Sequence, residues 1–194
     1  MVSQTTKSQL QTKFENDVAA SLREKFEISN VNAQPILSKI IINIGVGKAL
    51  ENQKLKPEIR DEVFSTLQTI TGQRPIMRMA RVSVANFKVR EGAPSGVMVT
   101  VRRDRMWHFL DRLVNLAIPR IRDFRGLKQK SFDSGGNYSM GLTEQAVWPE
   151  INAAKISYPH GMHINMVFEN SNPEMSKFVL TELGMPFVKA EEQN

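Results

Sequence analysis

Hydrophobic and polar residues alternate in three segments, and each of them predicts a β-strand. In segment 36–47, every second residue from Ile40 to Val46 is aliphatic, so a strand would bury that set and place Asn43 on the opposite face. Segment 97–102 alternates in the same way, with an outer face formed by Met98, Thr100 and Arg102. The third segment, 163–168, has an inward set made of Ile164, Met166 and Phe168.

Apolar residues at helical spacing predict two helices in the first half of the chain. The second of them, 56–71, has Pro57 in its first turn and Gly72 directly after its last residue, which are common start and stop signals. The first has a strict four-residue repeat, made by Leu10, Phe14, Val18, Leu22 and Phe26.

Two further helices are predicted in the second half. One is expected to be capped by Asp104 and to end at Pro119. The other is expected to be capped by Asn172, with Pro173 in its first turn and a stop at Gly184. The core face of the first of these two helices would be formed by Met106, Leu110, Leu113 and Ala117.

The order of these elements predicts an α+β fold, with a mainly antiparallel sheet, helices packed on one face and long basic loops. A single domain is expected over residues 9–188, between a mobile N-terminal extension, 1–8, and an acidic tail, 189–194. Segment 77–96 is expected to be a long functional loop with a short strand around 87–89.

The segment 119–141 combines a cationic stretch with turn-forming residues. Residues 134–137 are expected to form the turn of a hairpin, flanked by Phe132 and Tyr138, because Ser, Gly and Asn favour tight turns. The cationic stretch before it would be anchored in the core by Ile121 and Phe124.

Positive charge is concentrated in the middle of the chain. The 194 residues carry a formal net charge of +6. Residues 72–130 contain fourteen Lys or Arg and four Asp or Glu, whereas the rest of the chain contains twelve and sixteen. Eleven of those fourteen cations are arginine. Such a concentration is typical of a surface that binds an anionic partner, most often nucleic acid.

The composition also predicts the compartment. The chain has no cysteine, which excludes disulfide bonds and thiolate metal sites. No apolar run reaches the ~18 residues of a membrane-spanning helix. The N-terminal segment lacks the hydrophobic core of a signal peptide. We therefore expect a cytoplasmic protein with no membrane partner.

None of the common catalytic or cofactor motifs is complete. In IGVGKAL, Ile42 stands where a phosphate-binding Walker loop needs glycine, and Ala49 stands where it needs Ser or Thr. His160 and His163 are three residues apart, but the sequence places no third metal ligand near them. We therefore predict no enzyme, no cofactor and no bound metal.

The types of polar residue favour RNA over a generic anion. Guanidinium groups hold phosphates through paired hydrogen bonds and stack on bases. On the outward strand faces, an amide, a hydroxyl and a guanidinium can contact base edges, 2′-hydroxyls and phosphates: Asn43, Thr100 and Arg102. Four cations share a segment without a hydrophobic face, and an anion would offset their repulsion: Arg78, Arg81, Lys88 and Arg90.

Other interpretations stay open at the level of residue patterns. Some arginines, such as Arg105 and Arg112, could simply solvate exposed helix faces. The outward strand positions could belong to an ordinary solvated sheet face. The alternative function is that of a basic module that bridges to an acidic protein without specific RNA recognition.

Longer motifs occur in the order and spacing of one known family. They are INIGVG, ITGQRP, ARVSVANFKVREG, RMWHFLDRL, IPRIRDFRGL and KSFDSGGNYSMG, followed by WPEI. Through them, residues 33–187 resemble the bacterial-type large-subunit ribosomal protein five (L-five) family. The resemblance implies a structural constituent of the large ribosomal subunit, located in the central protuberance, that binds 5S rRNA and helps to attach it. It also implies contact with the P-site tRNA, with neighbouring large-subunit rRNA and proteins, and a bridge to small-subunit head protein thirteen.

The resemblance also assigns roles to particular residues. It implies that 5S rRNA is bound by Asn43, Gln73, Thr100 and Arg102. It places a tRNA-facing loop at 77–87, with contacts from Arg78, Arg81 and Ser83. Val82 departs from the family, whose members commonly have a basic residue there, so one phosphate-neutralising charge is missing. An additional basic RNA surface is expected from Lys88, Arg90, Arg120, Arg122 and Arg125.

Overall fold

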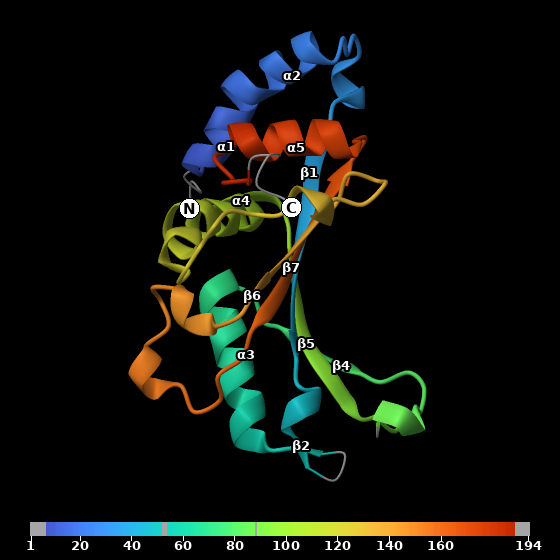
Figure 1. Ribbon diagram of the computed structural model, residues 1–194, viewed down its shortest axis with the longest axis vertical. Helices are drawn as coiled ribbons and strands as arrows, with labels where there is room; N and C mark the ends of the chain where they lie inside the picture. The colour runs from blue at the N-terminus through green and yellow to red at the C-terminus, as the bar shows by residue number, and fades with distance from the viewer. Residues whose placement is uncertain (1–6, 52–53, 88, 189–194) are drawn as a thin grey trace, which may run out of the picture. The chain divides into compact units, whose positions relative to one another are not determined.

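The computed structural model describes residues 7–51, 54–87 and 89–188 (Figure 1). The strands are β1 (Ile36–Gly45), β2 (Leu50–Glu51), β3 (Lys54–Leu55), β4 (Ile76–Met79), β5 (Pro94–Val101), β6 (Tyr138–Leu142) and β7 (Met162–Glu169). Five of them form one sheet in the order β4-β5-β1-β7-β6, and β2 pairs with β3 separately. Together with the helices packed on it, this mainly antiparallel sheet confirms the predicted α+β class.

Helices and shorter helical turns make up the rest of the regular structure in the described residues. The α-helices are α1 (Gln9–Lys13), α2 (Ala19–Lys25), α3 (Pro57–Thr71), α4 (Arg103–Arg112) and α5 (Pro173–Glu182). Two π-helical turns are Phe14–Val18 and Leu113–Ala117. The 3-10 turns are Val31–Ala33, Gly47–Ala49, Ala85–Phe87, Ile118–Arg120, Gln129–Ser131, Gln145–Val147 and Ala153–Lys155. In the ranges that the structure describes, no helix is both long and apolar enough to cross a membrane.

The contacts divide the chain into two compact units, which are described separately below. Unit 1 comprises Met1–Ile40, Arg102–Met140 and Asn165–Asn194, and unit 2 comprises Ile41–Val101 and Gly141–Ile164. The single domain expected over residues 9–188 stays a prediction. The expected N-terminal extension and acidic tail fall largely or wholly outside the described residues.

In unit 1, the first predicted helix contains a wider turn. The π-helical turn Phe14–Val18 joins α1 directly to α2. A four-residue repeat drifts by about 40° per repeat in a regular α-helix, because 3.6 residues make one turn. The wider turn compensates for that drift, so that four members of the repeat are buried: Leu10, Phe14, Val18 and Leu22. Phe14 packs against Trp107 of α4, with 5.3 Å between the ring centroids.

The start of α4 differs from the prediction. Asp104 does not cap the helix, because Arg102 holds the cap position and Asp104 lies in the first turn. The chain turns sharply at Arg103, whose φ is 53°, and the helix therefore begins before the expected polar cap. The predicted core face is confirmed, since all its members are buried: Met106, Leu110, Leu113 and Ala117.

The predicted hairpin turn at 134–137 is confirmed. Asp133 donates its backbone N–H to Asn137 O at 3.0 Å, and Phe132 pairs with Tyr138 across the turn. The rings of Phe132 and Tyr138 lie 4.6 Å apart between centroids. Hydrogen bonds from the side-chain amide and then the backbone N–H of Asn137 lower the pKa of the Asp133 carboxyl.

The cationic stretch before this hairpin is anchored differently from the prediction. Ile121 and Phe124 are only half-buried, whereas Ile118 and Leu127 are buried. The backbone fixes Leu127, because its N–H donates to Pro186 O at 2.8 Å and its carbonyl accepts from Val188 N at 3.0 Å. That partner segment lies so far along the chain that local patterns gave no sign of the pairing.

Helix α5 begins and ends as predicted. The Asn172 side chain accepts a hydrogen bond from Met175 N at 2.8 Å, and Gly184 follows the helix with a φ of 95°. The first turn of α5 packs against the hairpin at Gly136. A Cβ added to Gly136 would lie 2.8 Å from both Asn172 O and Ser176 Oγ.

In unit 2, α3 packs on the sheet and matches the predicted boundaries. The helix begins at Pro57 and is ended by Gly72 in the left-handed region, with a φ of 65°. Its core face is buried at Val63, Leu67 and Ile70. The residues of segments 36–47 and 97–102 predicted to face inward are also buried, and all except Ile40 of unit 1 lie in unit 2: Ile40, Ile42, Ile44, Val46, Val97, Val99 and Val101.

The long loop predicted at 77–96 is shorter in the structure. β4 extends to Met79 and β5 begins at Pro94, so the connection covers residues 80–93. The strand expected around 87–89 is wrong: Ala85–Phe87 is a 3-10 turn, and Val89 makes only an isolated bridge to Val84. Alternation over so few residues does not distinguish a strand from a folded loop.

Residues 143–161 form an irregular segment of unit 2 that hydrogen bonds from side chains hold in place. Glu62 of α3 accepts hydrogen bonds from the backbone N–H groups of Ser157 and Tyr158, both at 3.1 Å. Gln145 donates to Tyr158 O at 2.9 Å and accepts from His160 N at 2.7 Å. His160 is 6% exposed, and burial lowers the pKa of its imidazole.

We expect the free energy of unfolding to depend on pH through His160. Because the folded-state pKa lies below the unfolded value of about 6.5, the unfolded chain binds the proton first. The stabilisation is complete above that pH and is lost as the pH falls through the folded-state pKa. Urea unfolding at pH 7.5 and 5.5 should show a smaller pH dependence for His160→Gln than for the exposed control His163→Gln. Equal pH dependence in the two variants would contradict the assignment.

Candidate nucleic-acid interface

Strands β1, β5 and β4 are neighbours in the sheet (Figure 1). Several of their residues in unit 2 place polar side chains on one face of it. Asn43 in β1 and Thr100 in β5 are half-buried, while the residues on either side of each of them in the strand are buried. The register pairs Arg78 of β4 with Gly96 of β5. Cross-strand partners share a face, and Gly96 has the same alternation as Thr100, so Arg78 lies on this face too. We call it the polar sheet face.

Gly96 makes room for the side chain of Asn43. A Cβ added to Gly96 would lie 3.2 Å from Asn43 Oδ1 and 2.9 Å from Ile44 O. The amide of Asn43 therefore lies over β5 at the position that is paired with Arg78 on the other side. The sequence had placed Arg78 in a loop, whereas the structure places it on β4. Asn43 and Arg78 thus flank Gly96 from the two neighbouring strands on the same face.

Gln73 lies in a turn that is held from inside. The hydroxyl of Thr71, which is 3% exposed, donates to Leu67 O at 2.6 Å and accepts from Gln73 N at 3.4 Å. Gln73 itself is half-buried. Within the described ranges, no hydrogen bond engages the side-chain polar atoms of three predicted contacts, which are therefore available to a ligand: Asn43, Gln73 and Thr100.

Several hydrogen bonds connect described residues of the loop 80–93. Ala80 N donates to Ala93 O at 2.8 Å, and Val84 and Val89 exchange hydrogen bonds at 2.9 and 3.2 Å. Ser83 Oγ accepts from Glu91 N at 2.8 Å, so this predicted tRNA contact also closes the loop. Two further predicted contacts are exposed, Arg81 and Arg90, and Lys88 lies outside the described residues.

The remaining predicted cations belong to unit 1. Arg102 is exposed and extended, and it directly precedes α4. Arg120 ends the 3-10 turn Ile118–Arg120. The same short stretch contains two more exposed arginines, Arg122 and Arg125. Arg120, Arg122 and Arg125 therefore form a basic stretch that is separate in the chain from the polar sheet face, whereas Arg102 directly follows β5.

The chemistry of these surfaces suits phosphates and neutral polar groups. Arg78, Arg81 and Arg90 give the sheet and loop of unit 2 fixed positive charge, and Glu91 is the acid nearest to them in sequence. In the part of the chain that is described, no group of three or more His, Cys, Asp or Glu residues could hold a metal ion. What the structure brings together is a set of donors for an anionic, polar ligand.

Sequence patterns missed two residues that shape the polar sheet face. Gly96 is a glycine inside a strand, a signal for a close approach by a neighbouring group. The group that it admits, the Asn43 amide, comes from a strand far away in sequence. The sequence pattern indicates only that Thr71 ends a helix. Its hydrogen bonds show that it also holds the turn that carries Gln73.

The fold and this face define a class: an α+β protein whose sheet presents arginine and uncharged polar side chains on one face. Two family profiles divide most of the chain between them. One is described as "Ribosomal protein L5" and matches residues 30–90, and the other describes the C-terminus of the same ribosomal family and matches residues 94–187. The chain belongs to the ribosomal L-five family.

Full-length relatives support the same family. The chain is 49% identical over 187 residues to large ribosomal subunit protein uL5 of Streptomyces coelicolor, covering 96% of this chain and 98% of that protein. It is 48% identical over 178 residues to the uL5 protein of Carboxydothermus hydrogenoformans, with coverage of 92% and 97%. For the uL5 protein of Microcystis aeruginosa the identity is 46% over 178 residues, with the same coverage. The chain is therefore a structural, non-enzymatic protein of the large ribosomal subunit.

Proposed function

We propose that the polar sheet face binds 5S rRNA and helps to attach it to the central protuberance of the large subunit. The observation that supports this most is the state of Asn43, Gln73 and Thr100. These residues are half-buried and their side-chain polar atoms make no hydrogen bond to a described residue, although the sheet and the turn hold their backbones. Arg102 is proposed as a further contact from its place after β5.

Charged and neutral side chains contribute in different ways to RNA binding. Arginine contacts to phosphates supply affinity without reading sequence, and they make binding dependent on salt. Neutral donors and acceptors on a rigid surface read the shape, the 2′-hydroxyls and the base edges of a folded RNA. The polar sheet face offers both kinds of group, and Arg78 contributes the charge.

A titration with two RNAs tests this proposal. We expect the purified chain to bind 5S rRNA at least tenfold more tightly than an unrelated hairpin of equal length at moderate salt. A binder that depended on charge alone would not prefer either RNA. The affinity for both RNAs should fall as salt is raised, because phosphate contacts release counterions. Equal affinity for the two RNAs would favour the alternative, a basic module that bridges to an acidic protein.

The loop 80–93 is proposed as the contact with P-site tRNA. Hydrogen bonds between its described residues restrain its backbone, which reduces the conformational entropy lost on binding. Arg81 is exposed and is the main cation proposed there. Arg78 was expected to act with it, but its position on β4 suits the 5S rRNA contact as well. Ser83 would act mainly by holding the loop closed.

Val82→Lys is expected to strengthen binding of tRNA. The side chain of Val82 is 68% exposed, so a lysine fits without disturbing the fold and restores a charge close to Arg81. One added phosphate contact should tighten tRNA binding several-fold at low salt and less at high salt. Fluorescence anisotropy with labelled tRNA measures this effect. Val82→Gln is the matched neutral control, and an equal gain in both variants would contradict the electrostatic explanation.

The bridge to small-subunit head protein thirteen is proposed from the family alone, and no residue is assigned to it. Arg120, Arg122 and Arg125 are exposed in a stretch of unit 1 that is anchored at Leu127. They are proposed to face neighbouring rRNA, because exposed guanidinium groups hold phosphates through paired hydrogen bonds.

A further inference from the structure

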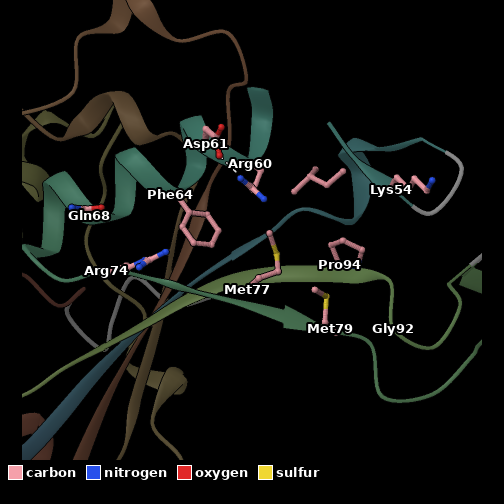
Figure 2. Close-up of a pocket in the computed structure, with 11 residues that line it drawn as sticks. Lys54, Arg60, Asp61, Phe64, Gln68, Arg74, Met77, Met79, Gly92 and Pro94 are labelled. Atoms are coloured by element: carbon pink, nitrogen blue, oxygen red, sulfur yellow. Dashed lines mark hydrogen bonds and ion pairs between the residues drawn. The ribbon is translucent and has the colours of Figure 1, made fainter. Parts of the chain in front are cut away.

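A hollow in unit 2 lies away from the polar sheet face, between α3 and β4. It has a volume of about 1040 Å³, and its floor is apolar, formed by Phe64 of α3 together with Met77 and Met79 of β4. Figure 2 shows Arg60 and Phe64 projecting from α3 toward Met77. Met77 and Met79 alternate with Arg78, so the hollow opens on the opposite side of β4 from the proposed 5S rRNA contact.

One wall of this hollow is the edge of a sheet. In the order β4-β5-β1-β7-β6, β4 has a single neighbour among the described strands. Every second residue of β4 therefore directs its backbone N–H and C=O away from β5. Such an edge can accept an extended peptide as an added strand, with alternate side chains in the adjacent pocket. Methionine suits a floor of this kind, because its side chain adapts to different partners.

The rim of the hollow is cationic. Three of its lining residues are positively charged, Lys54, Arg60 and Arg74, and one is negatively charged, Asp61. In Figure 2, Arg74 lies at one end of the hollow and Lys54 at the other. Arg60 contacts Asp61 at 3.0 Å, yet its side chain is 56% exposed and keeps donors for a ligand. Because cationic side chains lie along the whole length of the hollow, they favour a partner segment whose negative charges are distributed along its own length.

We propose that this hollow docks an extended, acidic segment of a partner protein, which adds to β4 as a further strand. Apolar side chains at alternate positions of that segment would contact Phe64, Met77 and Met79. Its carboxylates would pair with Arg60, Arg74 and Lys54. A protein segment is favoured over RNA because the edge strand offers backbone hydrogen bonds that match a peptide. Two of the three floor side chains are also flexible methionines, and Phe64 alone does not make a platform on which successive bases could stack.

A peptide selection tests the proposal on the full chain. Displayed random twelve-residue peptides are selected against the protein, and we expect the recovered sequences to alternate apolar residues with Asp or Glu. For a synthetic peptide of that kind, Arg60→Glu/Arg74→Glu should raise the Kd at least tenfold. The control Arg105→Glu/Lys155→Glu, which changes two exposed cations elsewhere, should leave the Kd within about twofold. Met79→Glu, at a position that is 53% exposed, should also raise it tenfold without affecting folding.

Strand addition has its own signature. Two peptides are N-methylated at every second backbone nitrogen, one at the odd positions and the other at the even positions. One of them should lose binding and the other should keep it, because only alternate residues of an added strand bond to β4. The proposal is overturned if no acidic, alternating peptides are recovered, if both charge-reversed double variants bind equally, or if both methylated peptides bind. It is also overturned if Met79→Glu lowers the affinity of the protein for single-stranded RNA but not for any peptide, because the hollow would then be an RNA site.

Discussion

Replacing Asn43 and Thr100 together with alanine is expected to weaken 5S rRNA binding by roughly 5- to 150-fold, while the domain stays folded. Each side chain would lose hydrogen bonds to the RNA worth about 0.5–1.5 kcal/mol. Neither side chain makes a hydrogen bond within the described protein, so truncation leaves no buried group without a partner. Filter binding with labelled 5S rRNA measures the affinity, and thermal unfolding checks the fold.

The matched control changes the same residue types at exposed positions away from the polar sheet face. Asn16→Ala/Thr143→Ala removes one amide and one hydroxyl that are exposed. We expect this variant to bind 5S rRNA within about twofold of the unchanged chain. If the two double variants bind equally well, the polar sheet face is not the 5S rRNA site, whatever the specificity of the whole protein.

Gly136→Ala is expected to lower the free energy of unfolding by about 2–5 kcal/mol. Gly136 has a φ of 76°, a conformation that costs other residues about 1–2 kcal/mol. The added Cβ would also lie 2.8 Å from Asn172 O, a backbone atom at the start of α5. Moving that helix start costs a further 1–3 kcal/mol or so, as overpacking usually does. Urea denaturation followed by circular dichroism gives the free energy directly.

The neighbouring glycine, Gly135, provides the control for Gly136→Ala. A Cβ at Gly135 would lie 3.4 Å from Asn137 Nδ2 and 3.5 Å from Asp133 Oδ1, which are movable side-chain atoms. Gly135→Ala is therefore expected to change the free energy of unfolding by less than about 1 kcal/mol. Similar losses in both variants would show that the turn, and not its contact with α5, limits stability.

The elements with strong local signals could be predicted from the sequence. The boundaries of α3 were correct because Pro57 and Gly72 each act within one turn of the helix end. The inward faces of β1 and β5 were correct because alternation has a period of two residues. The start of α4 was wrong because the positive φ of Arg103 leaves no mark in the sequence. The strand around 87–89 was wrong because a 3-10 turn and a local bridge between Val84 and Val89 fold the loop, and alternation over so few residues does not reveal this.

The candidate site was predicted less completely. The outward positions of Asn43 and Thr100 followed from alternation, and the structure agrees with both. The position of Arg78 did not, because it depends on the register between β4 and β5, which local patterns do not determine. The anchors Ile118 and Leu127 were missed for a similar reason, since Leu127 pairs with residues near the end of the chain. Long-range pairing is the information that one sequence lacks.

The order of strands in the sheet also has a consequence during synthesis. β1 lies between β5 and β7, and β7 begins only at Met162. At about 5–20 residues per second, the apolar strand β1 waits on the order of ten seconds for its second neighbour to be translated. Pairings between strands so distant in sequence also form slowly, because a long loop must close first. A nascent chain of this family therefore exposes an aggregation-prone strand for most of its translation, and early capture by a chaperone or by RNA would protect it.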